Sequence, residues 1–500
     1  VSLSTGNITG SAGTLTGSSY AFTNSGTVTA NLAGSGAFTK TGAGTVTLSG
    51  ANTYTGGTTI SVGTLQGSSS SLQGNITNNA ALVFDQSTDG TYSDAISGTG
   101  SFAKSGTGTL SLSGTNSNTG ATTVSGGTLQ FAQTVSLYDN TPANWTASNL
   151  IVESGATAAF NVGGTGEFTA ANLDTLKALG DGSGGFQAGS SLGIDTTNAS
   201  GGNFAYNSNI TDTNGGVHSL GLAKLGTGTL TLSGTNTYTG GTTVKAGTLL
   251  SGASAALANG TAYTVDGGTL DLNDFNLTAS SLSGTGGSVD LGTANLIVDQ
   301  SNNTTYSGAI AGFFRFTKEG SGTLTLSGSS TYSGDLLASD GTLNISAGGS
   351  MSDRSGFIGR LIGDTGSVDV AGTWTHSSEL SVGHSGQGSL TIQDSGTVSN
   401  AVGTLGHFSG SSGSADVAGT WTNSNSLNVG YGGDGTLTIQ EGGIVNVNSG
   451  ASITALAVQS SSTGTINITG STAAGILNTA SVNGQLGTAT LNFNHTDSDY

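Results

Sequence analysis

The sequence has no cysteine, a single proline at Pro142, and few charged residues, which make up 7% of the chain. Without cysteine, disulfide bonds, thiolate metal sites and cysteine nucleophiles are excluded. A typical soluble domain has about 25% charged residues, so the surface here must be hydrated mainly by Ser, Thr, Asn and backbone groups. No apolar run approaches the roughly 20 residues that a membrane-spanning helix needs.

Basic residues are the scarcest charged group, because 9 Lys and Arg stand against 28 Asp and Glu, for a formal net charge of −19. The acidic residues are scattered and form no tail, so we interpret the charge as serving solubility. Without a basic patch to replace counterions on phosphate, nucleic acid is excluded as a partner. The sequence starts at Val1 and shows no signal peptide, and we expect such a signal to lie outside it.

Glycine is abundant, with 88 of 500 residues, and 34% of the chain is hydrophobic. Disordered chains combine low hydrophobicity with high charge, which is the opposite of this composition. The Val, Leu and Ile residues mostly alternate with Thr or Ser, as in strands whose side chains point alternately to two faces. Leu230 and Leu232 are predicted to point inward on this pattern, and so are Val429 and Ile439. The sequence therefore predicts an ordered, all-β protein.

Four segments share one template without gaps, typified by LAKLGTGTLTLSGTNTYTGGTTVKAGTL at 222–249; the others are 38–65, 102–129 and 316–343. We interpret two positions of the template as structural repeat slots. One slot is always lysine: Lys40, Lys104, Lys224 and Lys318. The other is tyrosine in three copies and Asn118 in the second copy; the tyrosines are Tyr54, Tyr238 and Tyr332.

A second kind of unit follows, since residues 352–398 and 399–445 match at a constant offset of 47. Within it a hydrophobic residue followed by glycine recurs at steps of 24, 23 and 24 residues: Ile358-Gly359, Val382-Gly383, Leu405-Gly406 and Val429-Gly430. A period in the twenties is the length of one turn of a solenoid. Such short strands become stable by stacking turn upon turn, about 4.8 Å apart.

The fold predicted from these repeats is a parallel β-helix of roughly 20 turns and on the order of 100 Å in length. A β-propeller or a Greek-key array is the alternative, since 47 residues is a plausible blade length. The template copies are 64, 120 and 94 residues apart, counted from their equivalent glycines Gly44, Gly108, Gly228 and Gly322. Unequal spacing favours a stack, because a closed ring tolerates it poorly.

We divide the chain into five segments. Residues 1–130 and 208–351 are β-helix with two templates each, and 352–445 hold two tandem 47-residue β-solenoid units. Residues 446–500 continue the β-helix and are expected to stop inside a further repeat, because 491–500 resembles 82–92 and 296–306. Residues 131–207 are an irregular insertion, in which 169–180 predicts one short helix with Thr169 as N-cap and Gly180 as C-cap.

The template TGxGTLTLSGxNTYTGGTTVxxGTL resembles the passenger-associated transport repeat of autotransporters, the proteins of type V secretion. The 47-residue unit, with LSVGHSGQGSLTIQDSGTV and LNVGYGGDGTLTIQEGGIV, resembles a second repeat of the same class. The resemblance implies a right-handed parallel β-helix passenger on the outer surface of a Gram-negative bacterium. It also implies a partner outside this sequence, the C-terminal outer-membrane translocator barrel of the same polypeptide. We expect the passenger to be a monomer.

Enzymatic chemistry is not expected. Enzymes built on parallel β-helices need clustered carboxylates, or carboxylates with Lys or Arg, on one face for acid–base work. The acids here are sparse and recur in repeat slots, as Asp369 does with Asp416. The five histidines show no metal-ligand spacing such as HExxH, and His384 corresponds to Tyr431 in the sister unit. We therefore predict no catalytic residues, no metal site and no cofactor.

Two groups of residues are candidates for surface binding. Trp374 and Trp421 occupy one slot of the 47-residue unit; they are interpreted as packing anchors, or, if exposed, as an aromatic ladder that stacks on sugar rings. Arg354 and Arg360 form a dense mixed-charge cluster with Asp353 and Asp364, interpreted as a surface ion-pair group or as a binding or catalytic site.

The function that these observations favour is a structural surface-display rod, an adhesin-like autotransporter passenger. Two alternatives stay open on the same scaffold. One is a carbohydrate-active enzyme that resembles pectin lyases, and the other is a glycan-binding module that uses Trp374 and Trp421. Host or environmental glycans or surfaces are the external partners expected of a display rod or a binding module.

Overall fold

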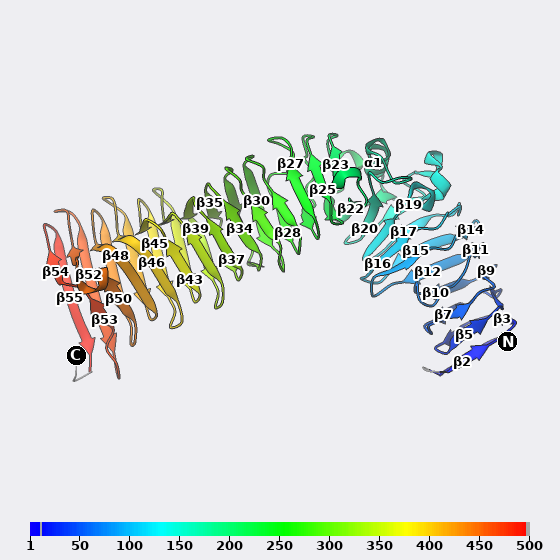
Figure 1. Cartoon of the computed structure of the whole chain (residues 1–500), viewed down its shortest axis with the longest axis horizontal. Helices are drawn as coiled ribbons and strands as arrows, with labels where there is room; N and C mark the ends of the chain where they lie inside the picture. Colours follow the sequence, from blue (N-terminus) through cyan, green and yellow to red (C-terminus); the bar gives the residue numbers. More distant parts are fainter. Residues whose placement is uncertain (11–12, 497–500) are drawn as a thin grey trace. The chain divides into compact units, whose positions relative to one another are not determined.

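The computed structural model describes residues 1–10 and 13–496, which form two compact units, Val1–Gly247 and Thr248–Tyr500. Within each unit, strands pair in parallel with strands of the neighbouring turns (Figure 1). The chain makes about 22 turns of parallel β-solenoid. The predicted parallel β-helix is thus confirmed. A propeller or a Greek-key array is wrong, because both are built from antiparallel strands.

The first unit contains four groups of hydrogen-bonded strands. The first group is β1 (Ser2–Leu3), β3 (Ser19–Phe22), β6 (Ala37–Lys40), β9 (Thr58–Ile60), β11 (Ile76–Asn78) and β14 (Ile96–Ser97). The second is β4 (Gly26–Val28), β7 (Thr45–Leu48), β10 (Thr64–Gly67), β12 (Ala81–Asp85), β15 (Ser101–Ser105), β17 (Thr122–Val124), β19 (Leu150–Val152) and β21 (Gly185–Phe186). The third is β2 (Thr14–Thr16), β5 (Asn31–Gly34) and β8 (Thr53–Tyr54). The fourth is β13 (Gly90–Tyr92), β16 (Thr109–Leu112), β18 (Thr128–Phe131), β20 (Thr157–Asn161), β22 (Ser190–Asp195), β23 (Asn203–Tyr206), β24 (Leu220–Leu225), β25 (Thr229–Leu232) and β26 (Thr242–Val244).

The second unit has three faces. The first face contains β30 (Leu277–Ser283), β32 (Leu296–Asp299), β35 (Phe316–Glu319), β38 (Asp335–Ala338), β41 (Ser355–Ile358), β44 (Glu379–Val382), β51 (Ile453–Leu456) and β54 (Ser481–Gly484). The second contains β27 (Thr248–Ser251), β29 (Thr269–Asp271), β31 (Ser288–Asp290), β34 (Ala309–Gly312), β37 (Ser329–Tyr332), β40 (Ser350–Asp353), β43 (Thr373–His376), β50 (Ile444–Val447) and β53 (Ile476–Asn478). The third contains β33 (Thr304–Tyr306), β36 (Thr323–Leu326), β39 (Asp340–Ile345), β42 (Thr365–Val370), β45 (Gln387–Ile392), β47 (Ser412–Val417), β49 (Asp434–Ile439), β52 (Thr463–Gly470) and β55 (Thr488–His495). The long strands β46 (Thr397–Leu405) and β48 (Thr420–Val429) belong to both the first and second faces, and β28 (Thr261–Val265) pairs with β30.

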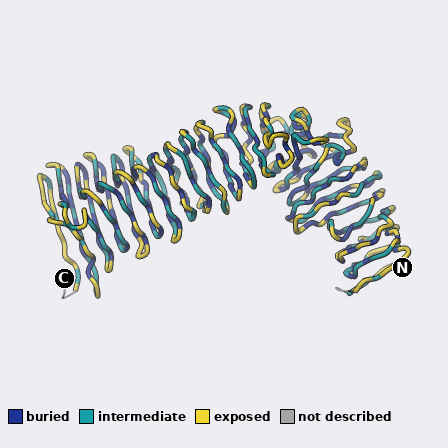
Figure 2. The backbone as a smooth tube through the Cα atoms, viewed as in Figure 1, coloured by how far each residue is buried: buried dark blue, intermediate teal, exposed yellow. Residues whose placement is uncertain are grey.

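Alternation of apolar and small polar residues gives each turn its buried side, as the repeated change of colour along the tube in Figure 2 shows. In β25 the two leucines Leu230 and Leu232 are fully buried, while the two threonines that alternate with them are partly exposed. Val429 and Ile439 are also fully buried, so the predicted inward orientation is confirmed at all four positions. Full burial of such a side chain contributes about 1.5–3 kcal/mol, and every turn adds several.

The predicted helix is present as α1 (Ala170–Lys177), and its N-cap is Thr169 as expected. Thr169 Oγ1 accepts from the backbone N–H of Asn172, whose side chain in turn accepts from the N–H of Thr169. The C-terminus differs from the prediction, because α1 ends at Lys177 and its C-cap is Ala178, not Gly180. The chain leaves the helix early since the carbonyl of Leu179 accepts a hydrogen bond from Phe186 N.

The solenoid continues through residues 131–207, since Leu129, Ala158 and Leu192 align in successive turns. The irregular parts of this segment are its connections, which hold α1 and four short 3-10 helices at Thr134–Ser136, Tyr138–Asn140, Pro142–Asn144 and Ser200–Gly202. The five-segment division stays a prediction. Residues 497–500, at the end of the predicted further repeat, lie outside the described residues.

Candidate functional site

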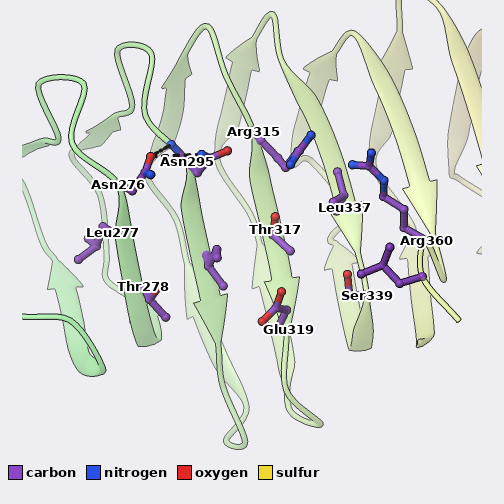
Figure 3. Close-up of a pocket in the computed structure, with 12 residues that line it drawn as sticks. Asn276, Leu277, Thr278, Asn295, Arg315, Thr317, Glu319, Leu337, Ser339 and Arg360 are labelled. Carbon is purple, nitrogen blue, oxygen red and sulfur yellow. Dashed lines mark hydrogen bonds between the residues drawn. The ribbon is translucent and has the colours of Figure 1, made fainter. Parts of the chain in front are cut away.

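The first face of the second unit carries an open groove, which we name the Arg315–Arg360 groove (Figure 3). Its volume is about 550 Å³, within the range of roughly 300–1,000 Å³ found for ligand sites. Its lining comes from β30, β32, β35 and β38, from the residues directly before and after these strands, and from the loop that follows β41. The groove therefore crosses several successive turns.

The floor of the groove is a row of outward-facing side chains, one from each of four turns: Thr278, Ile297, Thr317 and Leu337. The residue before each of them is apolar and points into the core, and these core residues are aligned as well: Leu277, Leu296, Phe316 and Leu336. Thr317 and Leu337 are only 4% and 7% exposed, so this part of the outer face is recessed.

One wall consists of the residues that precede the strands. Asn276, Asn295 and Arg315 occupy equivalent positions in three turns, each one residue before the aligned core residue. Asn276 Oδ1 accepts hydrogen bonds from Asn295 N at 2.8 Å and from Asn295 Nδ2 at 3.2 Å. Arg315 continues this row of polar side chains and replaces the short amide by a guanidinium that reaches over the floor.

The far end is closed by the loop of residues 359–364, which connects β41 to β42, whereas β38 and β39 are joined by Ser339 alone. Asp364 Oδ2 accepts a hydrogen bond from Leu361 N at 2.9 Å, which holds the loop in a turn. The guanidinium of Arg360 lies 5.3 Å from the ring centre of Phe357, a cation–π contact that orients the side chain toward the groove.

The lining of the groove contains two arginines and one carboxylate. Arg315 and Arg360 line it and take part in none of the ion pairs found in residues 1–10 and 13–496. The Nε atom of Arg315 is buried and has no hydrogen-bond partner in this part of the chain. Glu319 is the one carboxylate of the lining, and burial, followed by nearby acidic side chains such as Asp299, raises its pKa.

A row of aromatic and imidazole rings continues from Phe357 along the loops that follow the first face. The ring centroids are 5.2 Å apart for Phe357–His384, 4.9 Å for His384–His407, and 5.4 Å for His407–Tyr431. Phe408, half exposed, lies 4.5 Å from His407. Burial lowers the pKa of both histidines, and for His384 the neighbouring His407 adds to this effect. We name this row the corner ladder.

The four repeat-slot lysines are fully buried. The Nζ atom of Lys224 donates to Leu225 O at 2.7 Å, to Gly226 O at 2.7 Å, and to Ala246 O in the next turn at 3.0 Å. Lys104 and Lys318 make the same three kinds of bond, and Lys40 bonds to Gly42 O and Val62 O. Burial lowers the pKa of Lys224 to about 8, and the three carbonyl acceptors match the three donors of an ammonium group.

The tyrosine slot points inward as well. Tyr54 and Tyr238 hydrogen-bond through their hydroxyls to a threonine four residues later, Thr58 at 2.8 Å and Thr242 at 2.6 Å. The fourth copy has Leu336 in place of that threonine, and the buried Tyr332 hydroxyl has no partner among the described residues. Burial raises the pKa of Tyr238 and Tyr332.

The surface role considered for the tryptophans is wrong, because Trp374 and Trp421 are fully buried. They point into one inward row, with Val398 of the intervening turn between them. Their indole N–H groups donate to Asp353 Oδ2 and to Asn400 Oδ1, each at 2.7 Å. Side chains alternate between the two sides of a strand, so Trp374 and His376, two positions later, both point into the core.

The four residues of the predicted mixed-charge cluster do not come together. Arg354 pairs with Asp335 of the previous turn through two hydrogen bonds of 2.9 Å, and Asp353 points inward to Trp374. Arg360 and Asp364 belong to the groove loop and do not pair with either. Adjacent residues at a strand end point to opposite sides, so closeness in sequence does not place Asp353 next to Arg354 in space.

Several residues of this surface were not singled out by the sequence analysis: Arg315, Glu319, Asn276, Asn295, His407 and Phe408. One signal was available, since the chain has three arginines and all lie between 315 and 360. Among residues 1–10 and 13–496, no three His, Asp or Glu side chains are grouped as metal ligands would be. No helix in that part of the chain is long and apolar enough to cross a membrane.

The fold and the inward-facing repeat slots define a class of protein, the repetitive parallel β-solenoid. Comparison with known proteins agrees: a sequence profile described as the passenger-associated-transport-repeat matches residues 38–66, 102–131, 222–250 and 316–345. These are the four template segments. This match supports an autotransporter passenger region, and such passengers are displayed on the outer surface of the bacterial outer membrane.

One similar protein is the Adhesin BmaC autotransporter of Brucella suis biovar 1 (strain 1330), with 45% identity over 142 residues. The matching region is 26% of this chain and 4% of that relative, so the match spans a small part of a much longer relative. No solved structure matches the chain.

Proposed function

We propose that this chain is a non-enzymatic, adhesin-like part of an autotransporter passenger, linked in the same polypeptide to a translocator domain. One observation carries the proposal. The residues that define the repeats, including Lys224, Tyr238 and Trp421, lie inside the solenoid. The repeats therefore build the scaffold, and the unrepeated outer residues, the Arg315–Arg360 groove and the corner ladder, are left for contact with other molecules. The name of the similar adhesin supports this interpretation.

The enzymatic alternative has less support. Hydrolysis of a glycosidic bond commonly uses two carboxyl groups on either side of that bond, about 5–9.5 Å apart. Glu319 is the one carboxylate that lines the groove, so the lining does not supply the carboxyl pair of a glycosidase. A binding groove needs no such pair.

Adhesion can be tested with beads coated with the purified 500-residue chain and with control beads coated with an unrelated soluble protein. Under flow over cultured epithelial cells and over polysaccharide-coated glass, we expect the chain-coated beads to remain attached several times more often than the controls. Equal attachment on every surface would contradict an adhesin-like role. In parallel, polysaccharides incubated with the chain should release no reducing ends; release that is lost in Glu319→Gln would instead favour the enzyme.

A further inference from the structure

Of the three arginines of the chain, one forms an ion pair with a carboxylate, and the other two form none within residues 1–10 and 13–496. Arg354 is held by Asp335 of the adjacent turn through a bidentate pair with two bonds of 2.9 Å. Arg315 and Arg360 have no such carboxylate in residues 1–10 and 13–496. In a chain with a net charge of −19, acidic partners are plentiful, so two arginines without one in a single groove are a local exception.

The two unpaired arginine side chains also point toward one another. Figure 3 shows the guanidinium groups of Arg315 and Arg360 pointing toward one another across the strand that carries Leu337. Two like charges that face each other repel, and the recessed floor below them weakens the screening by water. A bound anion between them would turn this repulsion into two charge-assisted interactions, for which the planar guanidinium is well suited.

The rest of the lining indicates what kind of molecule carries the anion. In the floor, β32 is paired on both sides, with β30 and β35, and β35 is paired with β32 and β38. No strand edge is available here, so a peptide cannot bind by adding a strand. The side chains instead offer amides and hydroxyls from Asn276, Thr317 and Ser339 beside apolar patches at Ile297 and Leu337, which match the hydroxyl groups and the C–H faces of sugar rings.

We propose that the Arg315–Arg360 groove binds a carboxylated glycan, with a sugar carboxylate held between the two guanidinium groups. The inference rests on the proposed adhesin-like function and names its ligand class. Glu319 acts against the ligand, because its carboxylate lies in the same groove and repels the sugar carboxylate. This opposing charge distinguishes an acidic glycan from a neutral one, for which Glu319 would be a useful hydrogen-bond acceptor.

The test measures binding of the purified chain to an array that holds carboxylated, sulfated and neutral oligosaccharides, followed by titration of the carboxylated glycan that binds best. We expect binding to carboxylated members and not to their neutral counterparts. Arg315→Gln and Arg360→Gln should each weaken the affinity by about tenfold or more, since a hydrogen bond to a charged group is lost. Glu319→Gln should strengthen it severalfold. Arg354→Gln is the matched control and should change the affinity less than twofold.

The outcomes separate this inference from the proposed function. No binding to carboxylated glycans, binding confined to sulfated ones, or binding that Arg315→Gln and Arg360→Gln leave unchanged would overturn the groove assignment. In the last case, beads coated with the wild-type chain would still attach to cells, and the adhesin-like function would stand. Weaker affinity in Glu319→Gln would show that the ligand is neutral and would also overturn the assignment. Circular dichroism of each variant verifies that the solenoid is intact.

Discussion

The imidazole of His376 donates its Nδ1–H to Oδ1 of Asp353 over 2.5 Å, and both side chains are completely buried. The sister unit, 47 residues later, fills the same two positions with an uncharged pair in which the hydrogen bond runs in the opposite direction: Asn400 Nδ2 donates to Asn423 Oδ1 at 2.8 Å. In each unit the carboxylate or amide also accepts from a tryptophan. One buried slot thus holds either an Asp–His or an Asn–Asn pair.

We expect truncation of the Asp–His pair to lower the free energy of unfolding more than truncation of the Asn–Asn pair. His376→Ala leaves the buried Asp353 without its second donor, and we expect the free energy of unfolding to fall by about 3 kcal/mol or more. Asn423→Ala leaves an amide unpaired and should cost about 1–3 kcal/mol. Urea denaturation followed by tryptophan fluorescence measures both. An equal loss of unfolding free energy in the two variants would show that the Asp–His pair stabilises the fold no more than the Asn–Asn pair does.

The double variant Asp353→Asn with His376→Asn recreates the Asn–Asn pair in the first unit. We expect its denaturation midpoint to lie close to that of the wild type, because the donor and acceptor pattern of the sister unit is restored. If the double variant is as unstable as His376→Ala, the two slots are not equivalent.

The tyrosine slot offers a matched pair of single-atom deletions. Tyr332→Phe removes a buried hydroxyl that has no partner among the described residues, so we expect stability to be unchanged or to rise by up to about 1 kcal/mol. Tyr238→Phe breaks the bond to Thr242 and should cost about 1 kcal/mol. Thermal denaturation of the two variants compares them. A larger loss in Tyr332→Phe than in Tyr238→Phe would contradict the assignment.

The lysine slot is predicted to support stability although it buries a charge. Lys224→Met leaves three carbonyls without their donor, in two successive turns, and should lower the free energy of unfolding by about 3 kcal/mol. Lys245→Met, at an exposed position, is the control and should change it by less than about 0.5 kcal/mol. Similar midpoints for the two variants in urea would mean that the three bonds contribute little.

The corner ladder predicts a dependence of stability on pH. The pKa values of His384 and His407 are lowered in the folded chain from an ordinary value of 6.5. As the pH falls through 6.5, the unfolded chain therefore binds protons that the folded ladder does not, and stability falls until the pH passes below the folded pKa values. The denaturation midpoint should drop between pH 7.5 and 5.5, a range above the titration of ordinary carboxylates.

The variant that tests this is His384→Tyr with His407→Phe, in which tyrosine copies the residue of the sister unit at the first position. Its midpoint should change less between pH 7.5 and 5.5 than that of the wild type. An unchanged slope would show that the pH dependence does not come from the corner ladder.

The solenoid scaffold could largely be predicted from the amino-acid sequence. A gapless template and a step of about 23 residues predict parallel stacking, because identical side chains recur at the spacing of one turn and need a neighbour to bury them. The same alternation predicts Leu230 and Val429 in the core. The boundary of α1 was less readable, because a backbone bond from Phe186 to Leu179 competes with the expected cap at Gly180.

The Arg315–Arg360 groove could not be predicted from the repeat pattern. Its side chains are about one turn apart, but the turns differ in length, and the loop at 359–364 is longer than the connection one turn earlier. Register therefore decides which outward residues meet, and it brings Arg360 toward Arg315 while it turns Asp353 and Trp374 inward. The amino-acid sequence by itself determined the repeating scaffold, since local alternation and period act within each turn. Only the tertiary structure decided the binding surface, because that surface is made of contacts between turns.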